Sequence, residues 1–512
     1  MSQIGEDIAS FFKFRSAYER QVFLVVAAAT VVLAAVAVFT SPLKVLAVII
    51  TLIAIGLSIT RPYLVVVALA IWTPFEPFLL KFIPDELYVY ARYFPEALIY
   101  LMAGLVTVHV LMERRKLPTT PIDLAFVLFM ISVCASAVLN LVSPSIFVFG
   151  VRQIIRYIIF YYAVVYLAPP KTRIRQTILI LFGIAAFESL LGIIQAALGG
   201  SIDAFLLPSE MKYYESIQLT VGVQQFWAPG QRVFATMGRY DQLGTFLAFF
   251  GLMALGLIYE AKKHIEHRWL GVLLLVLLPA LVLTYSRSSW FGFVLGFLII
   301  GLWIKRDRRV AAALAVFAVV IVSVFLYEGV VLRYLTDVPE QTITQRFFEA
   351  FSPESLKGEY YGLGRIYWWI NTPLVVVRSS PFFGVGPGQF GGGAAAALHN
   401  TTAYDKLGLP FGVYGTDGQI DCNWMSLWGE TGTVGIIFYL AMMIVIARTA
   451  YLAYKKSEDP WTRGLALGLL GAESSVAFQA FFGSYLEVRT LALFLWFIAA
   501  LVAVMVKREE LV

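Results

Sequence analysis

Arginines and acids occur inside apolar runs of this sequence, where charged side chains are rare. Arg152 and Arg156 lie one helical turn apart in the run 146–168, and Glu188 lies near the middle of the run 176–198. A charged group at the centre of a bilayer costs about 2.5–3.5 kcal/mol on insertion scales, so each needs a reason. One expectation is an internal ion pair between Arg156 and Glu188. The other is a path for an anion, because one acid cannot neutralise two arginines.

More arginines lie beside apolar runs. The membrane topology derived below places them on the outer side, where arginine is otherwise scarce. They are Arg232 and Arg239 before the run 241–259, Arg287 in the short turn 285–289, and Arg365 and Arg378 in the long segment 328–432. The planar guanidinium fork matches phosphate oxygens with two parallel hydrogen bonds. Several such groups around one outer cavity predict binding of a diphosphate or another polyanionic headgroup. For Arg378 a solvated surface charge is the favoured interpretation.

Other patterns carry weaker signals. The glycines of 384–393 lack the lysine and the strand–helix frame of a phosphate loop, and are typical of turns. The four histidines have no metal-ligand spacing, and no acid pair resembles an Asp-rich metal motif, so we expect metal-free chemistry. Trp368 and the other aromatics of 360–369 are expected either to stack on sugar rings or to anchor the chain at the membrane interface.

Composition identifies the elements that must position these residues. The chain has 512 residues, of which 60% are hydrophobic and 14% charged, against roughly 25% charged in a soluble domain. Only an all-α polytopic membrane protein fits. The net charge of +6 is too small and too dispersed to indicate nucleic acid. Cys134 and Cys422 are not expected to form a disulfide.

Fourteen apolar runs have membrane-spanning length, which predicts fourteen transmembrane helices. They are 22–39, 43–59, 63–80, 94–112, 122–142, 146–168, 176–198, 241–259, 269–285, 289–304, 310–327, 433–450, 464–482 and 488–506. Alternate connections and both ends carry 22 lysines and arginines, whereas the short connections opposite, with the helix ends, carry 5. Basic residues mark the cytoplasmic side, so both termini are predicted to be cytoplasmic.

This topology divides the chain into six parts. They are a cytoplasmic segment 1–21, helices 1–7 over 22–198, an outer loop 199–240, helices 8–11 over 241–327 with arginines at their outer ends, a large outer loop 328–432, and helices 12–14 with a short tail over 433–512. A structureless loop of about a hundred residues is uncommon, so 328–432 is expected to fold as a cap. No internal repeat relates the two halves, which weakens a transporter interpretation.

Three segments resemble the bacterial O-antigen ligase and O-antigen polymerase superfamily. Residues 232–244 are similar to its R-x-x-G-T-x-x-x-P-N segment, with Ala235 in place of glycine and Tyr240-Asp241 in place of Pro-Asn. Residues 285–290 resemble the S-R-[GS] turn. Residues 364–388 resemble G-R-x-x-x-W…P-x-x-G-x-G, and the stretch 421–435 that follows resembles H-N-x-x-L-x-x-x-x-E-x-G-x-x-G, with Asp421 at the position of the histidine.

The resemblance implies metal-independent, inverting glycosyl transfer without a cofactor, at the outer (periplasmic) face of the bacterial inner membrane. The implied donor is a polyprenyl-diphosphate-linked oligosaccharide, the acceptor a sugar hydroxyl, and the further partners membrane lipid, a chain-length regulator and a flippase. The implied catalytic residues are Asp421, Arg287 and Arg232. The implied diphosphate- and sugar-binding residues are Arg365, Arg156, Arg152, Arg239 and Trp368.

Asp421 is the candidate general base, because it lies just before a membrane helix that begins near Trp424. Neighbouring arginines are expected to lower its pKa. Two other roles are an ion pair that orients an arginine and a cap for the loop. Glu430 is a competing carboxylate, expected to point into the helix packing.

Three alternatives remain for the function. Ligases of the family resemble the histidine form and polymerases can carry aspartate, so a polymerase is favoured over an O-antigen ligase that uses a lipid A-core or another acceptor. A lipid-linked oligosaccharide flippase also fits the helix number and the intramembrane arginines. A structural subunit leaves the outer arginines unexplained.

Overall fold

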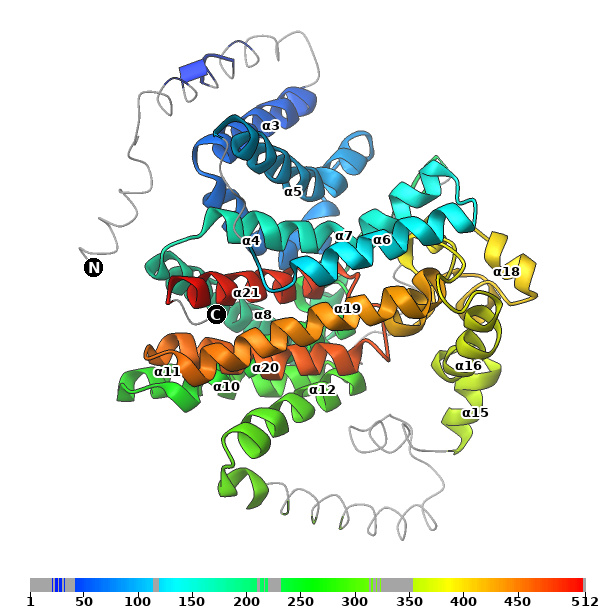
Figure 1. Ribbon diagram of the computed structural model, residues 1–512. Coiled ribbons are helices and arrows are strands. Elements are labelled where there is room, and N and C mark those ends of the chain that lie inside the picture. The colour runs from blue at the N-terminus through cyan, green and yellow to red at the C-terminus, as the bar shows by residue number, and fades with distance from the viewer. Residues whose placement is uncertain are drawn as a thin grey trace.

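The computed structural model describes residues 42–113, 119–209, 212–215, 217–219, 232–312 and 353–509, with isolated positions in 21–32 and 315–323. These residues are almost entirely helical (Figure 1). The long helices are α3 (Pro42–Thr60), α4 (Pro62–Leu80), α5 (Asp85–Glu113), α6 (Asp123–Leu139), α7 (Pro144–Leu167), α8 (Lys171–Leu198), α10 (Tyr240–Glu260), α11 (His264–Leu283), α12 (Arg287–Leu298), α19 (Asn423–Lys456), α20 (Pro460–Gln479) and α21 (Arg489–Arg508).

Short elements join these helices. They are α9 (Gly200–Leu206), the antiparallel pair β1 (Tyr213–Tyr214) and β2 (Ile217–Gln218), η2 (Ala235–Met237), η3 (Ile299–Ile304), α15 (Pro353–Tyr361), α16 (Arg365–Asn371), η4 (Thr372–Val377), α17 (Gly393–Ala397), α18 (Thr402–Leu407) and η5 (Val413–Gly415).

The centre of the bundle is built from α10, α20 and α21. Nearly all of α21 is buried, which agrees with a sequence that is apolar on every side. Helices α10 and α20 pack backbone to backbone, since a Cβ placed on Gly256 would lie 2.2 Å from the Gly468 nitrogen. Small residues allow such close approach where lipid provides no hydrophobic driving force between helices. The predicted spans 241–259, 464–482 and 488–506 therefore form the core.

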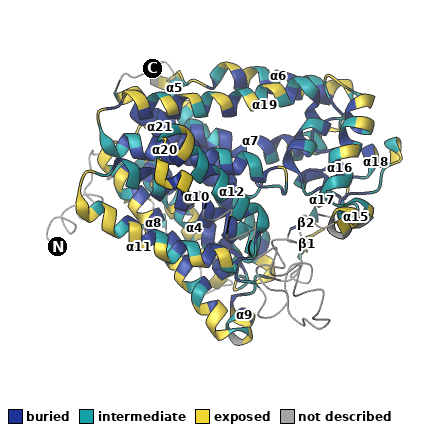
Figure 2. Cartoon of the chain, turned by 90° about the horizontal axis from the view of Figure 1, so that it is seen from below, coloured by how far each residue is buried: buried dark blue, intermediate teal, exposed yellow. Residues whose placement is uncertain are grey.

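The outward faces of the peripheral helices are apolar and exposed. Figure 2 shows exposed residues along α6 and α11, and α3 exposes large aliphatic side chains such as Leu46, Ile50 and Ile53. Such faces suit contact with acyl chains, because exposed apolar patches of this extent are rare on soluble proteins.

Ten of the described helices are long and apolar enough to cross a membrane. Twelve of the fourteen predicted runs coincide with described helices. Two of these twelve helices are not among the ten: α6, which has 17 residues, and α20. The remaining two runs, 22–39 and 310–327, lie largely outside the described residues. The structure thus confirms an all-α polytopic membrane protein, whereas the number fourteen stays a prediction.

The described part of the large loop, 353–422, gathers its short helices at one end of the bundle (Figure 1). These helices enclose a small apolar core of Trp368, Val376, Phe390, Tyr404, Phe411 and Ile420. The outward location of this segment stays a prediction, as do the domain boundaries.

Candidate active site

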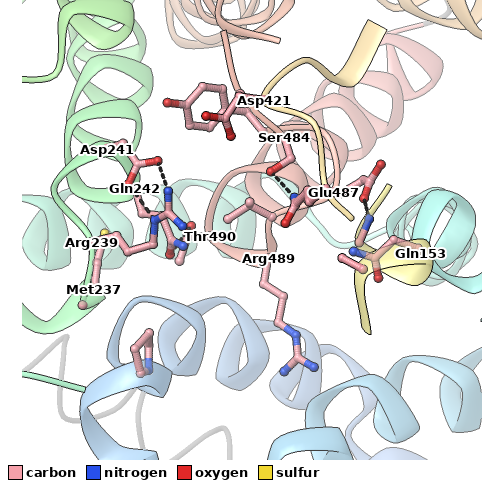
Figure 3. A pocket seen from close by; sticks show the side chains of 18 of the residues that line it. Gln153, Met237, Arg239, Asp241, Gln242, Asp421, Ser484, Glu487, Arg489 and Thr490 are labelled. Atoms are coloured by element: carbon pink, nitrogen blue, oxygen red, sulfur yellow. Dashed lines mark hydrogen bonds and ion pairs between the residues drawn. The ribbon is translucent and has the colours of Figure 1, made fainter. Parts of the chain in front are cut away.

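A cavity of about 700 Å³ lies where the loop segment meets the helix bundle. Its wall combines residues from the first half of the chain, on α4, α5 and α7, with residues from the starts of α10, α12 and α21 and from the loop (Figure 3). Seven arginines line it, namely Arg92, Arg152, Arg156, Arg239, Arg287, Arg365 and Arg489. Five carboxylates line it too, namely Glu76, Asp241, Glu359, Asp421 and Glu487.

Asp421 lies on the cavity wall two residues before α19 begins at Asn423. Its carboxylate lies 3.7 Å from a guanidinium nitrogen of Arg365, and its side chain is 47% exposed. Arg365 is held in turn by its Nε donating to the Phe482 carbonyl at 2.9 Å and by an ion pair with Glu359 at 3.4 Å. A helix start and a fixed arginine therefore both constrain where the Asp421 carboxylate points.

Burial in the cavity raises the pKa of Asp421 above its ordinary value, although Arg365 and Arg239 act to lower it. The exposed half of the side chain lies on the cavity wall, and desolvation by the surrounding protein outweighs the effect of the two arginines. The sequence-based expectation of a lowered pKa is therefore wrong in sign. A raised pKa makes a carboxylate a stronger base once it is ionised.

Arg239 and Asp241 form a two-pronged ion pair beside Asp421. Arg239 Nε and Nη2 donate to the two carboxylate oxygens of Asp241 at 2.9 and 3.0 Å (Figure 3). Burial acts to lower the pKa of Arg239, but Asp241, Asp421 and Tyr485 together more than offset this, so that the pKa rises. Arg239 is therefore a fixed positive group on the cavity wall.

Arg287 was predicted to lie inside the turn 285–289, but the helix starts earlier: Arg287 is the first residue of α12, and it lines the cavity. The next residue, Ser288, shares a hydrogen bond of 3.1 Å with the Tyr485 hydroxyl, which lies on the same wall. Arg232 does not line the cavity; its guanidinium lies over the Tyr240 ring, 4.3 Å from the centroid. A catalytic role for Arg232 stays a prediction, and its contact with the site runs through Tyr240.

Arg152 and Arg156 both pair with Glu96 of α5, at 3.3 Å each. Arg156 also donates to the Glu487 carbonyl at 2.6 Å. The predicted pair between Arg156 and Glu188 is wrong, because α7 packs on α5 and α21 rather than along α8. Both arginines nevertheless line the cavity, as the anion-path interpretation expected.

Glu188 instead fixes the segment that leads to Arg239. Its carboxylate accepts hydrogen bonds from the Thr236 amide at 3.1 Å and hydroxyl at 2.6 Å. The side-chain oxygen of Gln195, two turns further along α8, accepts from the amides of Phe234 and Ala235 at 3.0 and 2.9 Å. Two polar residues of one membrane helix thus satisfy the backbone of η2 and set the path of 233–239.

Arg92, Arg489 and Glu76 belong to the cavity wall, and the motifs did not reveal them. Arg92 pairs with Glu76 at 3.1 Å, and Arg489 pairs with the same carboxylate while donating to the Arg92 carbonyl at 2.8 Å. Both arginines are among the five basic residues of the short connections and helix ends opposite the predicted cytoplasmic side. Their scarcity there was the signal that could have singled them out.

Trp368 has no exposed surface and donates from its indole to the Leu363 carbonyl. The prediction that it stacks on sugar is therefore wrong, because it belongs to the core of the loop segment. Its neighbour Trp369 lines the cavity and donates to the Phe481 carbonyl at 3.1 Å.

The glycine-rich segment 384–393 forms turns whose amides are already bonded. Glu430 accepts from the Gly388 and Phe390 amides at 2.9 and 3.3 Å, and Glu487 accepts from the Gly393 amide at 2.9 Å. These carboxylates already accept the hydrogen bonds of backbone amides that a phosphate loop would direct at its ligand. Glu430 points into the packing, as expected, and does not line the cavity. Among the described residues, no group of three His, Cys, Asp or Glu side chains could hold a metal ion.

Residues 272–440 match the family described as O-antigen ligase. The match confirms the resemblance to the O-antigen ligase and polymerase superfamily, and supports a membrane glycosyltransferase of that type. It includes the turn at 285–290, Arg365 and Asp421, but not the segment 232–244. No curated protein matches the chain.

Proposed function

We propose that this chain transfers a glycan from a polyprenyl diphosphate to a sugar hydroxyl, as a polymerase of O-antigen or exopolysaccharide repeat units. The observation that supports this most is one cavity that brings a carboxylate with a raised pKa together with seven arginines. The carboxylate suits proton removal from an acceptor hydroxyl. The arginines suit a diphosphate leaving group, whose developing charge they can stabilise without reorganising.

Asp421 acts as the general base in this proposal. The acceptor hydroxyl oxygen attacks the anomeric carbon of the donor sugar, and its proton passes to the Asp421 carboxylate. The bond between the anomeric carbon and the diphosphate oxygen breaks, and its electron pair leaves with the diphosphate. A base in this role contributes typically 10²–10⁴-fold to the rate.

The polymerase assignment depends on Asp421, because the ligase form of the family has histidine at this position. A ligase, which transfers finished chains to another acceptor, is the alternative. A flippase needs access from both faces of the membrane, and it gives no role to a loop segment that brings Arg365 and Asp421 to the cavity wall.

Turnover of the purified chain in detergent, without any sealed compartment, separates these functions. A polymerase converts a lipid-linked repeat unit into a ladder of longer lipid-linked glycans. A ligase produces no ladder but transfers glycan to an added acceptor, and a flippase gives no new product. Absence of product with both kinds of acceptor would contradict glycosyl transfer.

A further inference from the structure

Four arginines line the cavity on the side away from Asp421, and we call them the four-arginine cluster. Arg92 lies on α5, Arg152 and Arg156 on α7, and Arg489 at the start of α21. Figure 3 shows Arg489 extending away from Asp421, toward helices α4 and α5, where it pairs with Glu76. The cluster is carried by helices long enough to span the membrane, whereas Asp421 and Arg365 belong to the loop segment.

The four-arginine cluster carries more positive than negative charge. Its four guanidinium groups share two carboxylates, Glu76 and Glu96. An excess of two positive charges remains, or of one if the nearby Glu487 carboxylate is included. Arg156 is only 4% exposed, and its Nε has no hydrogen-bond partner among the described residues. A buried cation that its neighbours do not fully neutralise is costly, and an anion in the cavity would lower that cost.

The arginines around Asp421 have no such excess. Arg239 is paired with Asp241, and Arg365 lies between Glu359 and Asp421. With Arg287 included, three arginines there face three carboxylates on the cavity wall. A dianionic ligand at this end would be repelled by the negative charge of the Asp421 carboxylate, the proposed general base.

The geometry of an inverting displacement separates the base from the leaving group. The attacking hydroxyl and the departing oxygen lie on opposite faces of the anomeric carbon, so a base and a leaving group bound at the same point cannot both act. With Asp421 at one end of the cavity, the diphosphate must lie at the other end. The charge balance and the reaction geometry therefore agree.

We propose that the donor diphosphate binds at the four-arginine cluster, and that Arg92 and Arg489 are diphosphate-binding residues. This rests on the proposed glycosyl transfer. Arg365 and Arg239 then position Asp421, and the sugar to be transferred lies between the two ends. Glu76 and Glu96 fix the guanidinium groups in place and set how much charge remains for the ligand.

Binding of glycan-free polyprenyl diphosphate to the purified full-length chain tests this without requiring catalysis. We expect Arg489→Gln and Arg156→Gln each to weaken binding about ten-fold or more, since each removes a charge-assisted contact. Arg365→Gln is expected to change it by less than about two-fold, as is the matched surface variant Arg378→Gln. Loss of binding in Arg365→Gln with retention in Arg489→Gln would overturn the proposal.

Glu96→Gln gives a readout that damage to the fold cannot mimic. Glutamine keeps the shape of the side chain and removes one negative charge, so the excess on the four-arginine cluster rises and diphosphate binding should tighten by about three-fold or more. A purely structural role for the cluster predicts weaker or unchanged binding, and that result would count against a ligand site.

Two further probes separate this inference from the proposed function. Polyprenyl monophosphate should bind more weakly than the diphosphate, and inorganic diphosphate more weakly than its lipid ester; equal binding of inorganic diphosphate would overturn a site for a lipid headgroup. Tight, cluster-dependent binding of polyprenyl diphosphate without any glycosyl transfer would refute the enzyme while supporting the diphosphate site.

Discussion

The Asp421 carboxylate lies 3.7 Å from the Arg365 guanidinium, at the boundary between the loop segment and the first turn of α19. At this distance the contact is an ion pair rather than a close hydrogen bond. Arg365 is held by two other groups, so it can stay in place while Asp421 exchanges this contact for an acceptor hydroxyl. The structure contains the ion pair with an arginine that was one of the roles expected for Asp421, and the base role that we propose is compatible with this pair.

Replacing Asp421 by asparagine should abolish most glycosyl transfer. The change keeps the shape and removes the basicity, so we expect turnover to fall by about 100-fold or more while polyprenyl diphosphate still binds. Asp421→His should restore part of the activity, because histidine is a base and occupies this position in related ligases. Near-normal turnover in Asp421→Asn would refute the base role, and lost donor binding would favour the ion pair instead.

The pH dependence of transfer should follow the raised pKa of Asp421. The base works ionised, so the rate falls as the pH drops through this pKa, at a higher pH than for an exposed carboxylate. Arg365 favours the ionised form, and Arg365→Gln should therefore move the acid limb of the rate profile to still higher pH. The exposed Arg378→Gln variant should leave the limb unmoved, and a shift to lower pH in Arg365→Gln would contradict the assignment.

The helices could be predicted because each depends on a local run of apolar residues. The location of Asp421 could be predicted because its motif begins just before a helix start. The partners of the buried charges could not, since Glu76 and Arg489 are separated by 413 residues and meet only through packing. The pairing of Arg156 with Glu188 was inferred from neighbouring runs, and neighbours in sequence need not face each other in a bundle.

Trp368 and Trp369 show the same limit at the scale of one helical turn. Consecutive residues of a helix point about 100° apart. One of the two therefore enters the apolar core of the loop segment, and the other faces the cavity. The sequence marks both as aromatic residues near a sugar site, and only the packing of α16 tells them apart.

Chelators should leave transfer unchanged. The excess positive charge of the four-arginine cluster can stabilise a leaving diphosphate, which is the task a divalent cation otherwise performs. Turnover of the purified chain should therefore be equal with excess EDTA and with added Mg²⁺ or Mn²⁺. Activity that requires an added cation would contradict a metal-independent reaction.

The predicted orientation places Lys357 outside the cell and Arg308 inside it. Both side chains are exposed, so cysteines placed there should be accessible to a reagent. In a chain with Cys134 and Cys422 replaced by serine, an impermeant maleimide should label Lys357→Cys in intact cells, and Arg308→Cys only after lysis. The reverse pattern would invert the topology and move the cavity to the cytoplasmic side.

Ala235 lies at a backbone position suited to glycine, and this gives the last prediction. Its φ is +47°, in the left-handed region, and it stands where the resembling family segment has glycine. A non-glycine residue there carries about 1–2 kcal/mol of strain, partly offset because alanine restricts the unfolded chain. Ala235→Gly should therefore stabilise the protein by about 0.5 kcal/mol and raise the Tm in detergent by a degree or two.

The matched control is Ala248→Gly, at a fully buried position inside α10. There glycine removes a packed methyl group and lowers helix propensity, so the same substitution should destabilise by about 1 kcal/mol or more. Opposite signs for the two variants would show that Ala235 is strained. Destabilisation by both would mean that the Gln195 and Glu188 contacts hold η2 without strain.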